Sequence, residues 1–445
     1  MGNKTVYMYI LKTVVNLNAW FTAVSIYFIG KHLYNRRIGI FAAFFFAGYS
    51  VCMNAPGEVL PGNTEYFSSG FAAAAMALIC RPGGMFRWIS IFSSGILCAF
   101  ATTVNTRTGI FLVVLFLWLF LNRKSWKGLA KETMILFTGF LLPYLALVLY
   151  FVLQNAIEHF LFWQGDIVKF YINRYPVFIR IIRGIKGYLF FSGLIPLLFF
   201  CVLYIKQGIK EKPRDRRFLF IAGTFILAYL SVYSSWKHME RYYFTLFIPL
   251  CLMAAAALDE LTVQIKNVRP RHLAVTLTAF IAVALATPPL LYFHKNFRSA
   301  IDRKKSSIES IKAEETANKP AADYIKANTS DKEAIFVWPT GDLVYFYADR
   351  ILSPSFYDPE QRLLHVAYIP NKEAADRIWS FFFDTFAASP PALILDYTDG
   401  FTHDRGKYPS SQYIDEYVDK LKALVAREYE QRAEIGNITF YHRRK

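Results

Sequence analysis

The segment GIFLVVLFLWLFLNRKSWKGLAKETMILFTGFLLPYLALVLYFVL (Gly109–Leu153) shows most clearly the pattern that runs through the first two-thirds of the chain. Two apolar blocks, Gly109–Leu121 and Thr133–Leu153, flank a short loop that carries the cations Arg123, Lys124, Lys127 and Lys131. A helix needs about 20 residues to cross a hydrocarbon core, and cations gather in loops on the cytoplasmic side. The segment therefore predicts two membrane-spanning helices that are joined in the cytoplasm.

The same alternation of apolar blocks and loops continues up to about His294. It predicts a polytopic α-helical membrane protein with about ten transmembrane helices. We expect them near Tyr7–Gly30, Ile38–Asn54, Thr64–Cys80, Trp88–Thr103, Gly109–Leu121, Thr133–Leu153, Gly187–Ile205, Phe218–Tyr233, Tyr242–Leu258 and His272–His294. Every second loop is rich in Lys and Arg, which places those loops in the cytoplasm and both ends of the chain outside.

Composition supports the membrane prediction. The chain has 445 residues, 55% of them hydrophobic, and a mean hydropathy of +0.27. A net charge of +17 is also compatible with nucleic-acid binding, but many of the cations lie in the short loops between apolar blocks, so we expect no nucleic-acid partner. The five cysteines lie in or beside apolar blocks, which predicts neither a disulfide framework nor a zinc site.

After His294 the apolar blocks shorten and charges return, which divides the chain into a transmembrane domain, 1–297, and a small C-terminal α/β domain, 298–445. Strands are expected at Ala334–Trp338, Ala392–Leu395, Tyr429–Glu434 and Ile438–Tyr441, the last two as a hairpin across Gly436 and Asn437. Helices are expected at Lys319–Asn328, from a Thr340 cap to Ala348, and at Asn371–Ala387 and Gln412–Ala426. Strands that alternate with helices predict a mostly parallel sheet. No glycine-rich phosphate loop follows a strand.

Several motifs in the chain resemble a known family. They are IYFIGKHLYNRRIGIFAAFFFAG (Ile26–Gly48), NTE (Asn63–Glu65), TRTG (Thr106–Gly109), ERYYFTLFIPL (Glu240–Leu250) and ADYIKANTSDKEAIFVWPTGDLVYFYADRILSPSF (Ala322–Phe356). Their order and sidedness resemble the GT-C membrane glycosyltransferases, specifically the protein O-mannosyltransferases and the lipid A aminoarabinose transferases. Each motif alone is loose, but together they cover nearly the whole chain.

The resemblance implies transfer of a sugar from a polyprenyl-phosphate-linked donor to a protein, lipid or polysaccharide acceptor. The reaction would take place at the outer face of the cell (inner) membrane, with the C-terminal domain extracytoplasmic, or periplasmic in a Gram-negative cell. In the family an acid in the first outer loop is central to catalysis. Tyr7–Gly30 resembles the second family span, so this chain is expected to lack the N-terminal helix and that loop. The alternative is a non-catalytic or truncated GT-C-like protein that binds a lipid-linked sugar or a partner.

The donor phosphate of such a reaction needs cations at the outer edge of the bilayer, where scarce water strengthens charge-assisted bonds. Arg107, Arg241 and Lys237 are the candidates, because all three lie in loops assigned to the outer face. The alternative for each is an interfacial anchor or a structurally paired cation. A transporter is less favoured, because the sequence shows no convincing internal repeat.

The acceptor must lose a proton, which a carboxylate can take. Glu65 and Glu58 are the candidates in the outer loop, although Glu65 at the start of a span could equally pair with a cation or a helix N-terminus. Trp163, Tyr171 and Tyr175 lie in a long outer loop that could close over a substrate as a lid, or could belong to an aromatic belt. The outer carboxylates show no metal-ligand spacing, so we expect no metal and no cofactor.

Overall fold

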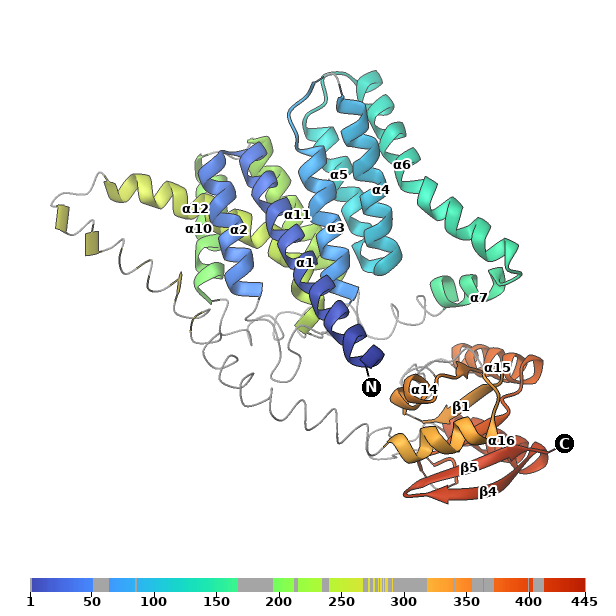
Figure 1. Ribbon diagram of the computed structural model, residues 1–445. Coiled ribbons are helices and arrows are strands. Elements are labelled where there is room, and N and C mark those ends of the chain that lie inside the picture. Colours follow the sequence, from blue (N-terminus) through green and yellow to red (C-terminus); the bar gives the residue numbers. More distant parts are fainter. Residues whose placement is uncertain are drawn as a thin grey trace. The chain divides into compact units, whose positions relative to one another are not determined.

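A computed structural model divides the chain into two compact units, Met1–Arg298 and Ser299–Lys445 (Figure 1). The structure describes residues 2–50, 64–84, 86–166, 195–211, 215–233, 240–266, 318–339, 341–353, 363, 372–398, 400–402 and 412–444, and several positions between 271 and 290. For residues 2–12, 240, 241 and a few others, it describes the backbone alone.

In the described residues of the first unit, all regular secondary structure is helical (Figure 1). Its α-helices are α1 (Gly2–Leu33), α2 (Arg36–Tyr49), α3 (Thr64–Ile79), α4 (Arg87–Val104), α5 (Ile110–Leu121), α6 (Trp126–Leu153), α7 (Ile157–Leu161), α10 (Ile195–Glu211), α11 (Arg216–Tyr233) and α12 (Phe247–Lys266). Three shorter helical turns accompany them, η2 (Thr106–Gly109), η3 (Phe162–Asp166) and η5 (Glu240–Leu246), and several described positions between residues 271 and 290 are also helical.

Four of these helical segments are long and apolar enough to cross a membrane: Thr13–Leu33, Arg87–Val104, Trp126–Leu153 and Tyr242–Ile265. A shorter apolar segment is Thr106–Leu121. Each expected span from Tyr7–Gly30 to Tyr242–Leu258 overlaps a helix, whereas most of His272–His294 lies outside the described residues. The structure therefore supports a helical membrane protein but does not confirm ten spans.

Close helix packing holds the bundle together. Helix α4 packs between α3 and α6, and α1 packs on α2 and α3. Glycines make two of these crossings tight: Gly95 of α4 lies against the backbone of α6, and Gly39 of α2 lies against the backbone of α1. Small residues at helix crossings let backbones approach in a membrane, where lipid removes the hydrophobic drive for association.

The loops expected in the cytoplasm use some of their polar groups within the protein. Arg37 pairs with Asp259 of α12 at 3.1 Å, and Arg87 pairs with Glu132 of α6 at 3.6 Å. Ser125 caps α6 by accepting the N–H of Gly128 at 3.0 Å. These contacts stabilise helix ends, which would otherwise leave backbone donors without partners.

The second unit contains a mixed five-stranded sheet with strand order β2-β1-β3-β5-β4. Its strands are β1 (Ala334–Trp338), β2 (Ile351–Leu352), β3 (Leu393–Asp396), β4 (Tyr429–Ile435) and β5 (Ile438–Arg443). Strand β1 runs parallel to β2 and β3, but β5 runs antiparallel to β3 and β4. The sheet is therefore mixed: the prediction of parallel pairing holds for β2, β1 and β3, whereas the predicted final hairpin joins β3 through the antiparallel β5.

Helices cover both faces of this sheet. Ile335 and Val337 share a core with α14 (Asp342–Ala348) and with a helix over residues 318–328. The alternate residues Phe336 and Trp338 contact Phe382 and Trp379 of α15 (Lys372–Ala388). This alternation follows from the two-residue period of a strand. The second unit is thus a layered α/β domain, as expected.

Most of the expected elements of this domain are close to those observed. Strand β1 has the predicted bounds, and α15 and α16 (Gln412–Glu428) begin and end within two residues of prediction. Strand β2 was not predicted, and Thr340 lies outside the described residues. With only two residues in β2, the N–H of Val337 instead donates to the hydroxyl of Tyr345 at 2.8 Å.

A buried histidine gives this domain a predicted pH dependence. His442 of β5 bonds the hydroxyl of Tyr324 at 2.9 Å, and this bond links the sheet to the helix over residues 318–328. Burial, then the charge of Arg432, lowers the pKa of His442 from its ordinary value of 6.5, while Glu430 opposes the shift. The neutral form is therefore favoured in the folded state, and its contribution to stability is lost as the pH falls from above 6.5 through the lowered pKa.

We expect the protection factors of the amides in residues 318–328 of the full chain, which correct for the intrinsic slowing of exchange at lower pH, to fall as the pH is lowered from neutral. His442→Asn removes the titrating group and should flatten this dependence. An equally steep pH dependence in the variant would assign it to other groups.

Candidate functional site

A break between two helices positions Arg107. Helix α4 ends at Val104, and Asn105 is extended before the 3-10 turn η2 carries the chain into α5. The side-chain oxygen of Asn105 accepts the N–H of Arg107 at 3.2 Å, and its backbone oxygen accepts the N–H and hydroxyl of Thr108 at 3.0 and 2.7 Å. Arg107 therefore lies on a short, well-bonded turn at the end of α4 that is predicted to face outward.

A second helix holds this turn from the side. Ser231 of α11 donates its hydroxyl to the backbone oxygen of Arg107 at 2.9 Å, and α11 contacts η2. The backbone of Arg107 is thus fixed by both the preceding helix and α11. Only its side chain remains to interact with other groups.

The guanidinium of Arg107 lies on the ring of Tyr242. The distance from Cζ to the ring centroid is 3.5 Å, within the range of a cation–π interaction. Within the described part of the chain, the buried Nη1 atom has no hydrogen-bond partner. A buried guanidinium N–H without an acceptor is costly, so this atom is a candidate contact for an anion.

Helix α3 brings a carboxylate to the same group of elements. Glu65 lies in its first turn and is 7% exposed, and its Oε2 atom accepts the hydroxyl of Thr64 at 3.2 Å. The next residue, Tyr66, packs against Phe244 of η5 with ring centroids 4.1 Å apart. Helix α3 contacts both η5 and η2. The elements that carry Glu65, Arg107 and Tyr242 therefore meet.

Other predicted site residues have different positions. Trp163 is half-buried in η3, which follows α7, and packs edge-on against Phe162 at 5.4 Å. The backbone of Arg241 belongs to η5, next to Tyr242, but its side chain lies outside what the structure describes. Glu58, Tyr171, Tyr175 and Lys237 also lie outside the described residues.

Sequence reasoning missed three residues of this site: Asn105, Ser231 and Tyr242. Asn105 stands before TRTG, and an Asn that precedes a helical turn is a common cap, so its role was detectable. Ser231 and Tyr242 belong to segments far from Arg107 in sequence, and only the fold brings them to it. Among the described residues, no cluster of three or more His, Cys, Asp or Glu side chains could hold a metal ion.

Comparison with known proteins rests on structure alone, because neither a family model nor a curated protein matches the sequence. An oligosaccharyltransferase of Archaeoglobus fulgidus, in complex with Zn and sulfate, superposes with a TM-score of 0.54 at 13% identity over 95% of this chain. ArnT of Cupriavidus metallidurans, bound to undecaprenyl phosphate, superposes with a TM-score of 0.53 at 13% identity over 97% of this chain. Both are GT-C glycosyltransferases.

The chain has a GT-C fold. It spans 59% of the length of that oligosaccharyltransferase and 83% of the length of ArnT. The archaeal enzyme AglB, in complex with an inhibitory peptide and a dolichol-phosphate, is similar over 95% of this chain with 12% identity and a TM-score of 0.52. At such identities the likeness establishes the GT-C fold that the motifs predicted, but a shared fold does not determine the activity.

Proposed function

We propose that this GT-C protein is a membrane glycosyltransferase that transfers a sugar from a polyprenyl-phosphate-linked donor to a protein, lipid or polysaccharide acceptor. The observation that carries the proposal is the guanidinium of Arg107, which has a buried N–H without a partner among the described residues. A phosphate oxygen is the acceptor that such a group fits best, because a guanidinium binds phosphate through charge-assisted bonds.

The position of Arg107 supports a lipid-linked ligand. It follows α4, which is long and apolar enough to span a membrane, and precedes the apolar helix α5. An arginine between two apolar helices of a membrane protein is expensive to desolvate, and such a residue usually marks a binding site or pairs with a residue of opposite charge. Tyr242 covers one face of the guanidinium but supplies no negative charge, so an anionic head group would complete its environment.

In the proposed reaction, an acceptor hydroxyl or amine attacks the anomeric carbon of the donor sugar. The bond from that carbon to the phosphate oxygen breaks, and polyprenyl phosphate leaves with the electron pair. Glu65 accepts the acceptor proton, with Glu58 as the second candidate base. Arg107, assisted by Arg241 and Lys237, binds the phosphate as its negative charge grows.

Further parts of the proposal concern the whole chain. Trp163, Tyr171 and Tyr175 would cover the substrates as a lid. The membrane domain would contain about ten spans up to residue 297, with the site at the outer face of the cell membrane. The domain from residue 298 would lie outside the cytoplasm. Membrane lipids surround the site, and no nucleic acid takes part.

Replacing Arg107 tests the proposal. We expect Arg107→Ala to weaken binding of undecaprenyl phosphate to the purified full chain at least about tenfold, which corresponds to loss of one charge-assisted contact. Transfer from radiolabelled polyprenyl-phosphate sugars in reconstituted membranes should fall by at least as much. Binding is read from the quenching of protein fluorescence by a brominated undecaprenyl phosphate.

The matched control is Arg123→Ala. Arg123 follows the opposite end of α5, and it too lies over aromatic rings, 3.9 Å from the centroid of Phe120 and 4.7 Å from that of Trp126. Removing it should leave binding unchanged. Equal losses in the two variants, or a wild-type chain that binds no lipid phosphate, would contradict the proposal. Saturable binding without transfer of any sugar would support a non-catalytic binding protein instead.

A further inference from the structure

The geometry points to Tyr242 as a positioning residue that sets the plane of the Arg107 guanidinium for an anion approaching in that plane. This inference rests on the proposed function, since it concerns how the same site holds a phosphate. Tyr242 lies in η5, more than one hundred residues after Arg107 in the chain.

Within the described part of the chain, the recorded contacts of Arg107 divide into two kinds. Asn105 and Ser231 bond its backbone N–H and carbonyl, so they fix where the residue lies but not how its side chain turns. The Tyr242 ring contacts the guanidinium itself, at 3.5 Å. The orientation of the charged group therefore depends on the ring.

The Tyr242 ring limits the direction from which an anion can reach the guanidinium of Arg107. The guanidinium is planar, and its N–H bonds point outward within that plane. Because Tyr242 covers one face, a ligand with two acceptor oxygens meets the donors best by approaching edge-on, as phosphate does in a bidentate pair. A stacked side chain has also lost its rotational freedom before the ligand arrives, which reduces the entropy cost of binding.

Packing next to Glu65 holds the turn that carries Tyr242 in place. Two residues after Tyr242, Phe244 packs against Tyr66, the neighbour of Glu65 at the start of α3. Phe244 also packs against Phe46 of α2 and Phe247 of α12, with centroids 5.7 and 5.6 Å away. The turn that presents Tyr242 is thus anchored in the bundle core, which makes it a firm support for the cation.

The test measures binding of undecaprenyl phosphate to the full chain in four variants: Tyr242→Leu, Tyr242→Phe, Arg107→Lys and the Arg107→Lys/Tyr242→Leu double variant. We expect Tyr242→Leu to weaken binding about fivefold to thirtyfold, the range from a partly exposed to a desolvated cation–π contact. Tyr242→Phe keeps the ring and should restore most of that loss. A lysine has no plane to orient, so in the Arg107→Lys background the leucine should add no more than about a twofold loss.

Four results would contradict either the inference or the proposed function. Equal losses from Tyr242→Leu in both backgrounds would assign Tyr242 a general packing role and overturn the inference. A Tyr242→Phe variant as weak as Tyr242→Leu would transfer the role to the phenol hydroxyl, which also overturns it. Normal binding by Tyr242→Leu, with Arg107→Ala still defective, would reject the inference and leave the proposed function intact. A wild-type chain that does not bind would reject the proposed function first.

Misfolding can be separated from a local effect by the thermal midpoint of each variant. If Tyr242→Leu also lowers the midpoint, the deciding measurement is lipid binding by Tyr242→Phe and by a Tyr242→Trp variant, each compared with binding by Tyr242→Leu. Both aromatic rings support a cation, and tryptophan does so best. The inference predicts that both bind better than the leucine variant, whereas a failure of both would overturn it.

Discussion

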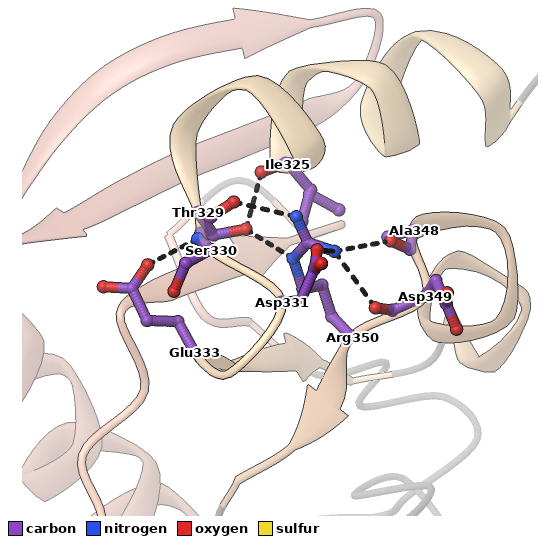
Figure 2. A network of polar contacts seen from close by, with 8 residues as sticks. All are labelled: Ile325, Thr329, Ser330, Asp331, Glu333, Ala348, Asp349 and Arg350. Atoms are coloured by element: carbon purple, nitrogen blue, oxygen red, sulfur yellow. Dashed lines mark hydrogen bonds and ion pairs between the residues drawn. The ribbon is translucent and has the colours of Figure 1, made fainter.

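Replacing Arg350 with leucine is expected to destabilise the C-terminal domain by about 3 kcal/mol, because four oxygens lose a charged donor at once, three of them on the buried residues Thr329 and Ala348. The side chain of Arg350 is only 4% exposed. Its guanidinium bonds the hydroxyl and carbonyl oxygens of Thr329, both at 2.8 Å, and the carbonyls of Ala348 and Asp349 at 3.2 and 3.1 Å (Figure 2).

This network ties together two elements that the sheet alone does not join. Thr329 ends the helix over residues 318–328, and Asp349, in the left-handed conformation with φ of 56°, ends α14. Figure 2 shows the guanidinium between these two helix ends. The last carbonyls of a helix have no partners within it, so one arginine supplies donors to both ends.

A second contact of Arg350 allows the contribution of its hydrogen bonds to be separated from that of its ion pair. Asp331 also pairs with Arg350, at 3.0 Å, but its side chain is 95% exposed. An exposed ion pair contributes about 0–1 kcal/mol, so Asp331→Asn should change little. Arg350→Lys keeps the charge but lacks the fork of donors, and should fall between the two.

Hydrogen exchange of the full chain measures these effects. Peptides covering β1 and the helix over residues 318–328 should exchange faster in Arg350→Leu, whereas peptides from the membrane helices should not change. If Asp331→Asn were as damaging as Arg350→Leu, the ion pair rather than the buried hydrogen bonds would be the main stabilising contact.

The features that could be predicted from the sequence are those that a local pattern determines. Apolar blocks gave the helices of the membrane unit, and Gly436, with φ of 65°, gave the turn of the final hairpin. Arg350 could not be assigned, because an arginine after an expected helix is usually a solvent-exposed residue. Its burial depends on the helix that ends at residue 328, which the fold brings close.

The candidate site also contains residues that a local pattern predicts and contacts that only the fold creates. Arg107 and Glu65 could be chosen because an ionisable residue at a helix mouth is unusual in any membrane sequence. Their meeting could not be derived, since it needs the contacts of α3 with η2 and η5. The ring of Tyr242 is one of many aromatic residues in the chain, and nothing local distinguishes it from a membrane-belt tyrosine.

Replacing Gly139 with valine is expected to separate α4 from α6 and destabilise the membrane unit by about 3 kcal/mol or more. A Cβ atom on Gly139 would lie 2.2 Å from the carbonyl oxygen of Phe92, and one on Gly95 would lie 2.2 Å from that of Leu136. Because backbone atoms make these contacts, no side-chain rotation relieves them. The two glycines therefore face each other's helices at the closest part of the crossing.

Unfolding of the purified full chain in mixed micelles, followed with increasing sodium dodecyl sulfate, measures the loss. Gly139→Ala should be destabilised less than Gly139→Val, and Gly95→Ala should resemble Gly139→Ala, because each adds one methyl group to the same crossing. Gly84→Ala is the control, since a Cβ atom there would meet nothing within 4 Å. If Gly139→Val unfolded at the same detergent fraction as Gly84→Ala, the two helices would not be in backbone contact in the membrane. The close crossing of α4 and α6 would then have to be abandoned.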